Sequence, residues 1–184
     1  MEGSGDIYNV SFGQDCSYIS GYAFSGCSNL GGGIHIGVVG DYSGIGEAAF
    51  ADCTGLDGEI YFPKSAEIGD YAFKNCGIKG DLLIKGFGNY AGKGVFENCS
   101  GLDGYLTYPA PKDNLDVREN SFKNCSNLIG NLKIPSGVTD YDVESGAFEN
   151  CSSLDGNISI GDKNILVGDN AFKNCSSLIG ELDF

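Results

Sequence analysis

Residues 125–151 read CSNLIGNLKIPSGVTDYDVESGAFENC, and this stretch contains every element of a unit that recurs along the chain. It opens and closes with Cys, and Phe148 stands three residues before the second Cys. The same spacing occurs seven times, at Phe24, Phe50, Phe73, Phe96, Phe122, Phe148 and Phe172. Successive Phe residues are separated by 26, 23, 23, 26, 26 and 24 positions. The 184-residue chain is therefore a tandem array of about seven repeats of 22–27 residues.

Each unit contains one strongly alternating segment, which follows a Leu placed three residues after Cys in nearly every unit. These segments read GGIHI, GEIYF, GDLLI, GYLTY, GNLKI, GNISI and GELDF. A period of two predicts a short strand with alternate side chains pointing inward and outward. An aliphatic residue five positions before Phe predicts a second, weaker strand. The Ala-Phe-x-x-Cys piece is too short for a stable helix and favours a turn or a short 3₁₀ segment.

A coil of about 25 residues cannot bury its own Phe, Leu and Ile, but stacked neighbours can cover them. We therefore expect equivalent strands of successive coils to pair in parallel, about 4.8 Å apart. The Phe residues and the aliphatic residues would then form continuous ladders through one core.

The unit resembles the leucine-rich repeat of BspA-like proteins, whose pattern runs approximately C-x-x-L-x-G-x-L-x-I-P-x-x-V-T-x-I-G-x-x-A-F-x-x-C. Residues 125–151 follow it almost throughout, and residues 45–53, IGEAAFADC, match its second half. The resemblance covers the chain from about residue 7 onward. It implies a β-rich solenoid: a leucine-rich repeat stack with a parallel sheet of short strands, turns and short 3₁₀ segments. We expect one domain over residues 1–184, with atypical outer loops at Gly86–Gly94 and Pro109–Asp116.

The two ends of the array lack the polar caps that solenoids normally carry. Asp6–Val10 reads as a degenerate first strand, and GELDF at residues 180–184 reads as a strand with nothing after it. These ends predict a fragment of a longer surface protein, or a chain whose ends stack on other molecules.

The charge of the chain argues against two classes of partner. Its 25 acidic and 11 basic residues give a formal net charge of −14, which disfavours nucleic acid. No stretch of about 18 apolar residues occurs, so membrane insertion is not expected either.

The eight cysteines are the most prominent candidates for chemistry. Seven follow the Phe positions, and stacking would place their side chains parallel rather than face to face, so we expect buried, reduced, structural thiols. Cys16 stands outside this series and is the candidate for a reactive or exposed thiol, although an unremarkable thiol is the favoured interpretation. The chain has no C-x-x-C and a single His, His35, which excludes the common Cys/His zinc sets. One His with no convergent nucleophile also disfavours an enzyme, and we expect no catalytic residues, no metal and no cofactor.

Three further patterns have plain structural interpretations. Gly86–Gly94 resembles a phosphate loop but fails its spacing twice, so a bulged turn is expected. Asp57, Asp103 and Asp155 recur just before the strands and could ligate Ca²⁺, although Asp is common in turns. Formal glycosylation sequons occur at Asn98, Asn124, Asn150 and Asn174, where we expect hydrogen bonds to the turn backbone instead.

The outward strand positions form two columns and supply the candidate binding residues. The first column reads Gly33, Glu59, Asp81, Tyr105, Asn131, Asn157 and Glu181, and the second reads His35, Tyr61, Leu83, Thr107, Lys133, Ser159 and Asp183. Solvated sheet surface is the plain interpretation, yet Tyr61, Leu83 and Tyr105 fall on consecutive coils and make an exposed apolar patch. The predicted binding residues are that patch, the bordering Glu59 and Asp81, and the column neighbours His35, Thr107 and Lys133.

Two functions are compatible with this surface. The resemblance implies a non-enzymatic, extracellular or cell-surface recognition module, because BspA-like repeats are associated with surface proteins and adhesion to host proteins. Its partner would be a protein or another macromolecule. The alternative is a structural spacer or self-assembling repeat, in which uncapped ends stack chain on chain.

Overall fold

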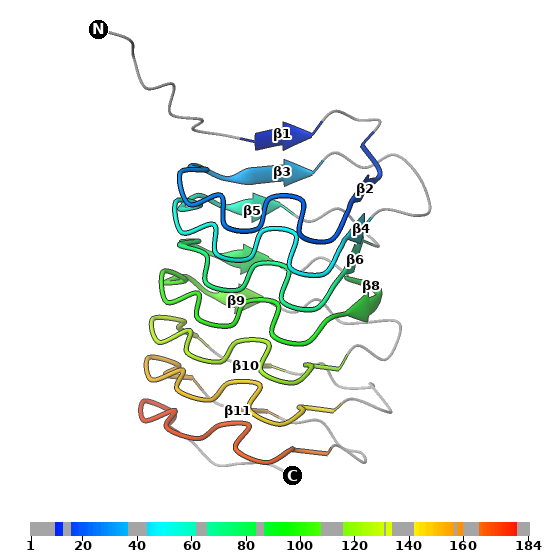
Figure 1. Cartoon of the computed structure of the whole chain (residues 1–184). Helices are drawn as coiled ribbons and strands as arrows, with labels where there is room; N and C mark the ends of the chain where they lie inside the picture. The colour runs from blue at the N-terminus through cyan, green and yellow to red at the C-terminus, as the bar shows by residue number, and fades with distance from the viewer. Residues whose placement is uncertain are drawn as a thin grey trace, which may run out of the picture.

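The computed structural model describes residues 10–12, 16–36, 44–61, 66–83, 87–107, 116–130, 132–133, 142–156, 158–159 and 166–179. They form one stack of coils, with the N-terminal coil at the top of Figure 1 and the C-terminal coil at the bottom. Each coil passes through a strand, then a second short strand or bridge, and then a run of turns. None of these residues lies in a helix, so none belongs to an apolar helix of membrane-spanning length.

The first strand of each coil pairs in parallel with its equivalents, as predicted. These strands are β1 (Val10–Phe12), β3 (Ile34–Ile36), β5 (Ile60–Tyr61), β7 (Leu82–Leu83), β9 (Leu106–Thr107), β10 (Leu132–Lys133) and β11 (Ile158–Ser159). The described ladders join β1 to β3 to β5, β7 to β9, and β10 to β11. The first strand was expected at Asp6–Val10; the described strand β1 runs over Val10–Phe12, with Val10 in register with Ile34. Residues 6–9 and the expected strand at 180–184 lie outside the described residues.

The predicted second strand forms the right-hand edge of the stack in Figure 1. It comprises β2 (Tyr18–Ile19), β4 (Gly44–Ile45), β6 (Ala66–Ile68) and β8 (Phe87–Ala91), and single parallel bridges continue it at Val117, Val143 and Val167. Ala66 pairs with Phe87 and Ile68 with Ala91, so the three residues of β6 face the five of β8. This bulge is the irregularity expected within Gly86–Gly94. In the other atypical segment, residues 109–115 lie outside the described part of the chain.

Of the two alternatives predicted for the Ala-Phe-x-x-Cys piece, a turn or a short 3₁₀ segment, the structure has turns, and their hydrogen-bonding pattern differs from that of a 3₁₀ segment. N–H groups alternate: one donates to the next coil, and its neighbour donates three residues back within its own coil. In the second coil, Ala48, Phe50 and Asp52 donate to the next coil at 2.8 Å each, and Ala49, Ala51 and Cys53 donate backward at 3.1–3.2 Å. A 3₁₀ helix would direct every N–H backward. The chain therefore makes successive turns, and half of their N–H groups hold the stack together.

This alternation needs a left-handed backbone at two places in every coil, two residues before and two residues after Phe. All fourteen of these residues have φ between 49° and 76°. Asn and Gly, which tolerate this region best, take ten of the positions. The four others are Tyr22, Ala48, Asp52 and Tyr71.

The Asn residues after Phe also connect the coils through their side chains. The amide Nδ2 of Asn98 donates to Oδ1 of Asn75 at 2.7 Å, and the same bond recurs from Asn124, Asn150 and Asn174 to the preceding Asn at 2.6–2.7 Å. Asn75 closes the series on Asp52 at 2.6 Å. The four sequon asparagines thus bond to each other, whereas we had predicted bonds to the turn backbone.

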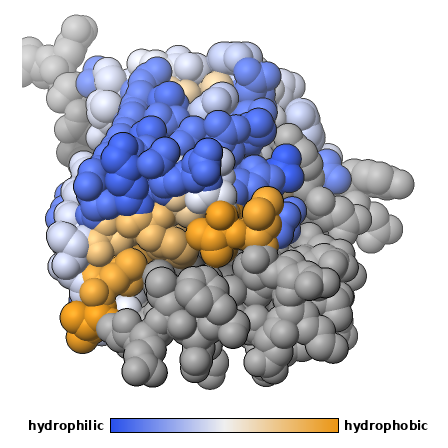
Figure 2. Space-filling view, turned by 90° about the horizontal axis from the view of Figure 1, so that it is seen from below, coloured by the Kyte–Doolittle hydropathy of each residue, from blue (hydrophilic) through white to orange (hydrophobic). Residues whose placement is uncertain are grey.

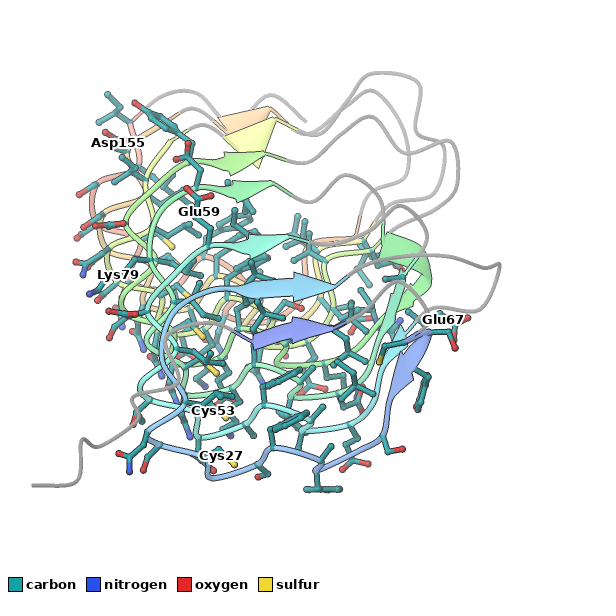
Figure 3. The ribbon with its side chains drawn as sticks, turned by 90° about the horizontal axis from the view of Figure 1, so that it is seen from above. Cys27, Cys53, Glu59, Glu67, Lys79 and Asp155 are labelled. Atoms are coloured by element: carbon teal, nitrogen blue, oxygen red, sulfur yellow. The ribbon has the colours of Figure 1, made fainter. Side chains whose placement is uncertain are left out.

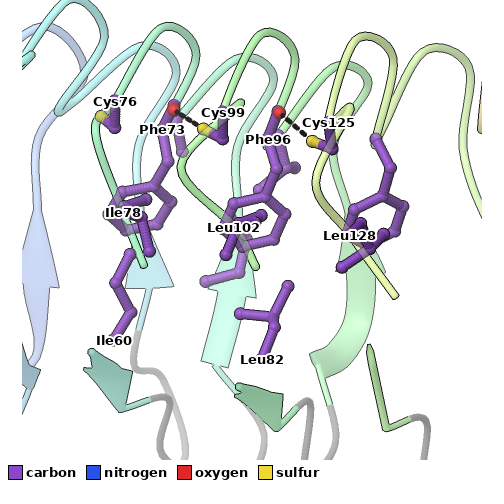
Figure 4. Packing of buried hydrophobic residues seen from close by; sticks show 14 of the residues in the cluster. Ile60, Phe73, Cys76, Ile78, Leu82, Phe96, Cys99, Leu102, Cys125 and Leu128 are labelled. Atoms are coloured by element: carbon purple, nitrogen blue, oxygen red, sulfur yellow. Dashed lines mark hydrogen bonds between the residues drawn. The ribbon is translucent and has the colours of Figure 1, made fainter. Parts of the chain in front are cut away.

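The core is a column of stacked Phe rings beside aliphatic and thiol columns (Figure 4). Six successive ring pairs run from Phe24 to Phe172, with centroids 5.1–5.7 Å apart and interplanar angles of 2–15°. The five inner rings are at most 1% exposed, whereas the two end rings are only partly buried. The predicted Phe ladder is confirmed.

The thiols form a third ladder, and the sequence analysis predicted them as stacked, buried and reduced. Each of six Sγ atoms donates to the Phe carbonyl of the preceding coil at 3.0–3.1 Å, and Figure 4 shows the bonds from Cys99 to Phe73 and from Cys125 to Phe96. All eight cysteines are free, and only Cys16 and Cys27 are not buried. Burial raises the pKa of the Cys53 and Cys175 thiols to about 11 and that of Cys99 to about 12.

We predict that a thiol-alkylating reagent labels two cysteines of the folded chain rapidly, Cys16 and Cys27, and six only after unfolding. The reactive form is the thiolate. The raised pKa keeps the six ladder thiols protonated, and their burial keeps the reagent away from them. Mass spectrometry of the protein after alkylation, with and without denaturant, counts both groups. Rapid labelling of Cys99 or Cys125 in the folded chain would contradict the ladder.

Alkaline pH is expected to destabilise the fold through the same thiols. Below the ordinary thiol pKa of 9.0, folded and unfolded chains both retain these protons, so the stabilisation is complete. Above it the unfolded chain releases protons that the folded chain keeps, so the free energy of unfolding falls as pH rises from about 9 toward 11. Urea denaturation at pH 7, 9 and 10.5 measures this loss. A Cys125→Ala variant removes one contributing thiol, so its stability should depend less steeply on pH than that of the parent.

Candidate functional site

The predicted binding residues lie on the strand side of the coils, and the backbone pairing places most of them beside one another. His35 pairs with Tyr61, and Leu83 pairs with Thr107, each in parallel register. Lys133 pairs with Ser159 in the separate β10–β11 ladder. The backbones of the second predicted column are therefore adjacent within three separate pairs of residues, and no described pairing joins one pair to the next. The directions of these five predicted side chains lie outside what the structure describes.

The first column contains the three predicted residues whose side chains the structure describes. Glu59, Asp81 and Tyr105 are all exposed, and Tyr105 is 58% exposed. Their backbones belong to the ladder, since the carbonyls of Glu59 and Tyr105 accept hydrogen bonds at 3.1 Å from Ile34 and Leu82. The prediction that these three side chains face outward is confirmed.

Tyr105 is held in place by two neighbouring coils. Its N–H donates to Oδ1 of Asp81 at 2.8 Å. Its ring lies against Gly130, where an added Cβ would meet the ring carbon Cδ1 at 2.5 Å. Tyr18 on Gly44 and Tyr71 on Gly94 repeat this arrangement of a Tyr ring over a Gly of the next coil. The exposed ring of Tyr105 is thus fixed before any partner arrives, which reduces the entropy lost on binding.

The column changes register directly after Tyr105. The repeat alignment pairs Tyr105 with Asn131, but the structure pairs it with Ile129, two residues earlier. Gly130 has φ of +101°, a conformation that other residues rarely adopt, and it leaves room for the Tyr105 ring. Asn131 itself lies outside the described residues.

The recurring carboxylates at the corner before the strands bind the backbone. Oδ1 of Asp57, Asp103 and Asp155 accepts from the N–H of a Gly in the preceding coil, at 3.3, 2.8 and 3.0 Å. Figure 3 shows Glu59, Lys79 and Asp155 on this side of the stack, away from Glu67. Within the described ranges, no group of three His, Cys, Asp or Glu residues could hold a metal ion. These positions are explained by turn hydrogen bonding.

The six basic side chains that the structure describes are all engaged in ion pairs. Lys74 contacts Glu97 at 3.0 Å and Lys93 contacts Glu119 at 2.8 Å, in each case across neighbouring coils. The remaining pairs are Lys79 with Asp57, Arg118 with Asp116 and Glu144, and Lys123 and Lys173 with Glu149. Hydrogen bonds from Lys123 and then Lys173 lower the pKa of Glu149. None of these six described side chains is therefore an unpaired cation available to a phosphate backbone.

The residues after Phe carry an alternation of charge that the sequence interpretation missed. Lys74, Glu97, Lys123, Glu149 and Lys173 all occupy the first position after Phe in successive coils. Reading this single column across the aligned repeats would have revealed it. Each acidic residue of this column lies between two basic residues of the adjacent coils. This alternation favours the observed alignment of neighbouring coils over an alignment that brings like charges together.

The repeats of this chain match those of a known protein family. The family model described as the BspA type leucine rich repeat region matches residues 44–179 in six copies, and the chain belongs to this family. Such proteins generally mediate protein interactions or have structural roles, are typically non-enzymatic and are often surface-associated. No curated protein matches the chain by sequence.

Two solved structures share the fold. A leucine-rich repeat protein of T. pallidum aligns with a TM-score of 0.74 and 24% identity, over 95% of this chain and 79% of that one. A leucine-rich repeat protein from Bacteroides ovatus ATCC 8483 aligns with a TM-score of 0.54 and 22% identity, over 93% of this chain and 54% of that one. These likenesses confirm the solenoid architecture.

Proposed function

We propose that this chain is a non-enzymatic recognition module, presented at a cell surface or secreted, which binds a protein partner through the outward face of its strands. The observation that supports this most directly is Tyr105, an exposed ring that Asp81 and Gly130 hold in place on a rigid sheet. Preorganised aromatic side chains are the usual centres of binding energy in protein interfaces. The surface association of the family supports the proposed location.

The proposed contact surface comprises Tyr61, Leu83 and Tyr105 at its centre, with Glu59 and Asp81 beside them and His35, Thr107 and Lys133 at its margin. Backbone pairing supports the adjacency of His35 to Tyr61 and of Leu83 to Thr107. Exposed Glu59 and Asp81 favour a partner with basic groups opposite them. No step of catalysis and no cofactor enters this proposal.

A photo-crosslinking experiment tests the location of the contact. A benzophenone amino acid is introduced at Tyr105, which is 58% exposed on the strand side, or at Tyr22, which is 60% exposed on the turn side. Each protein is irradiated with extracellular protein fractions. We expect a discrete adduct from position 105 and none from position 22.

Substitution then measures the contribution of the tyrosines to the affinity for the protein that crosslinks. We expect the double variant Tyr61→Ser with Tyr105→Ser to weaken binding at least about tenfold, whereas Tyr22→Ser leaves it unchanged. Equal binding by the double variant and the parent would refute the proposed contact surface.

A further inference from the structure

We propose that the strand-side surface around Tyr105 receives an arginine side chain of the protein partner. This surface comprises the exposed Tyr105 ring and three exposed carboxylates beside it, those of Asp81, Asp103 and Asp155. The inference rests on the proposed recognition through the strand face and adds the chemistry of the partner. Asp103 and Asp155 extend the proposed contact surface toward the corner of the stack.

Backbone hydrogen bonds hold the three carboxylates near the ring. Oδ1 of Asp81 accepts from the Tyr105 N–H at 2.8 Å, so this carboxylate lies at the base of the tyrosine. Oδ1 of Asp155 accepts from the N–H of Gly130 at 3.0 Å, and the Tyr105 ring lies against that Gly. Asp103 is two residues before Tyr105, and its Oδ1 accepts at 2.8 Å from the N–H of the residue before Asp81. Carboxylates from three different coils therefore lie around the ring.

Each of these carboxylates has an oxygen available to a partner. All three Asp residues are exposed, their hydrogen bonds use Oδ1, and no described group bonds to Oδ2. The described base on this side of the stack is Lys79 (Figure 3), and its Nζ contacts Oδ2 of Asp57 in the preceding coil at 3.5 Å. Three negative charges therefore surround Tyr105 while the neighbouring base is already paired, so charge complementarity favours a cation.

The Tyr105 ring supplies an aromatic face to such a cation. It is 58% exposed, and Gly130 supports it from one side. On another part of the described surface, apolar side chains gather at the C-terminal end of the stack, where Leu166 and Ile179 are 63% and 71% exposed (Figure 2). Toward the corner, the exposed described side chains beside Tyr105 are carboxylates instead. This side of the ring is therefore suited to a cation, which the electron-rich face of the ring attracts.

A guanidinium group matches the ring and the carboxylates at once. Its flat face stacks on an aromatic ring, and the N–H groups around its edge bond to carboxylates, often two at a time. A lysine ammonium is a compact charge without a face for stacking. The ring and the carboxylates are held in place before the partner arrives, so little side-chain entropy is lost on binding. We therefore expect arginine to bind more tightly than lysine.

Short peptides test this chemistry directly. Three fluorescein-labelled peptides with the same Gly-Ser sequence carry two arginines, two lysines or two citrullines, and citrulline keeps the shape of arginine without its charge. Fluorescence anisotropy measures the affinity of each peptide for the whole chain at low and at physiological salt. We expect the arginine peptide to bind about threefold more tightly than the lysine peptide, the citrulline peptide to bind least, and the affinities to fall as salt rises. Equal binding of the citrulline and arginine peptides would overturn the proposal.

Substitutions of Asp by Asn locate the site on the surface. Asn keeps a side-chain oxygen for each backbone N–H, so the triple variant Asp81→Asn, Asp103→Asn and Asp155→Asn removes three charges and preserves the fold, which circular dichroism checks. We expect this variant to bind the arginine peptide at least about tenfold more weakly than the parent. Tyr105→Ser should weaken it by about threefold, through loss of the aromatic face.

The matched control removes three charges elsewhere on the molecule. It combines Glu47→Gln, Glu67→Gln and Asp169→Asn, all exposed carboxylates, and Figure 3 shows Glu67 on the side of the stack away from Asp155. This control has the same net charge as the triple Asp variant, and it should bind the arginine peptide nearly as the parent does. Equal losses of affinity in the two triple variants would show a general effect of net charge and overturn the site.

The same variants separate this inference from the proposed function. A protein that crosslinks at position 105 and depends on the tyrosines, yet binds the triple Asp variant as tightly as the parent, would leave the proposed function standing and overturn the arginine contact. If no protein crosslinks at position 105, the proposed function fails. Selective loss of the arginine peptide from the triple Asp variant would still support the arginine site, because that measurement needs no natural partner.

Discussion

Replacing Phe122 by Ala is expected to lower the free energy of unfolding by about 4 kcal/mol. The ring is 1% exposed and stacks on Phe96 at 5.6 Å and on Phe148 at 5.2 Å. Its removal takes two ring contacts from the core and leaves a cavity that the rigid coils above and below cannot close. Urea denaturation followed by circular dichroism measures the change.

Phe172→Ala is the matched control for this prediction. Phe172 has one ring neighbour, Phe148 at 5.4 Å, and is only partly buried. Its replacement should cost less than half as much, because part of the ring already contacts water. Equal losses from the two variants would show that the ring column does not dominate the stability of the core.

Gly69→Ala is expected to cost about 3 kcal/mol, the second large effect. An added Cβ would stand 2.5 Å from the backbone N of Glu47 and 2.7 Å from the carbonyl carbon of Gly46. Both are main-chain atoms of the preceding coil, so only a separation of the coils could relieve the contact. Thermal unfolding and urea denaturation should both register the loss.

Gly26→Ala is the matched control, because it measures the loss of stability from replacing a Gly that has no close backbone contact. Gly26 has φ of +76°, and no atom lies within 4 Å of the position of an added Cβ. Only the left-handed conformation opposes Ala there, at a cost of about 1 kcal/mol. If Gly69→Ala proved no more destabilising than Gly26→Ala, the coils would be less tightly packed than the structure indicates.

The stack and its ladders could be predicted because the relevant residues recur at fixed spacing. In a stack of coils, Phe, Cys and the aliphatic residue five positions before Phe each lie beside the equivalent residue of the next coil. The spacing in the sequence therefore predicts which residues are neighbours. The second strand at Ile45 and Ile68 followed from the same reasoning, although each strand is only two or three residues long. The burial of the thiols followed from their place beside Phe.

Other features depend on contacts that a repeat alignment does not show. The pairing of Tyr105 with Ile129 follows from the Tyr105 ring occupying the space over Gly130, which is a property of two coils together. The alternation of N–H directions in the turns follows from left-handed residues at positions where Tyr, Ala and Asp also occur. The role of Asp57 could not be separated from metal binding until its bond to the Gly32 N–H was known.

The ladders carry a consequence for how such a molecule changes over evolutionary time. Six thiol bonds, five amide bonds and six ring contacts each join one fixed position of the repeat to one fixed position of the adjacent coil. Unequal recombination can therefore duplicate or delete a whole unit without creating any contact of a new kind. Length and core are inherited together, while the outward residues of each copy remain free to diverge.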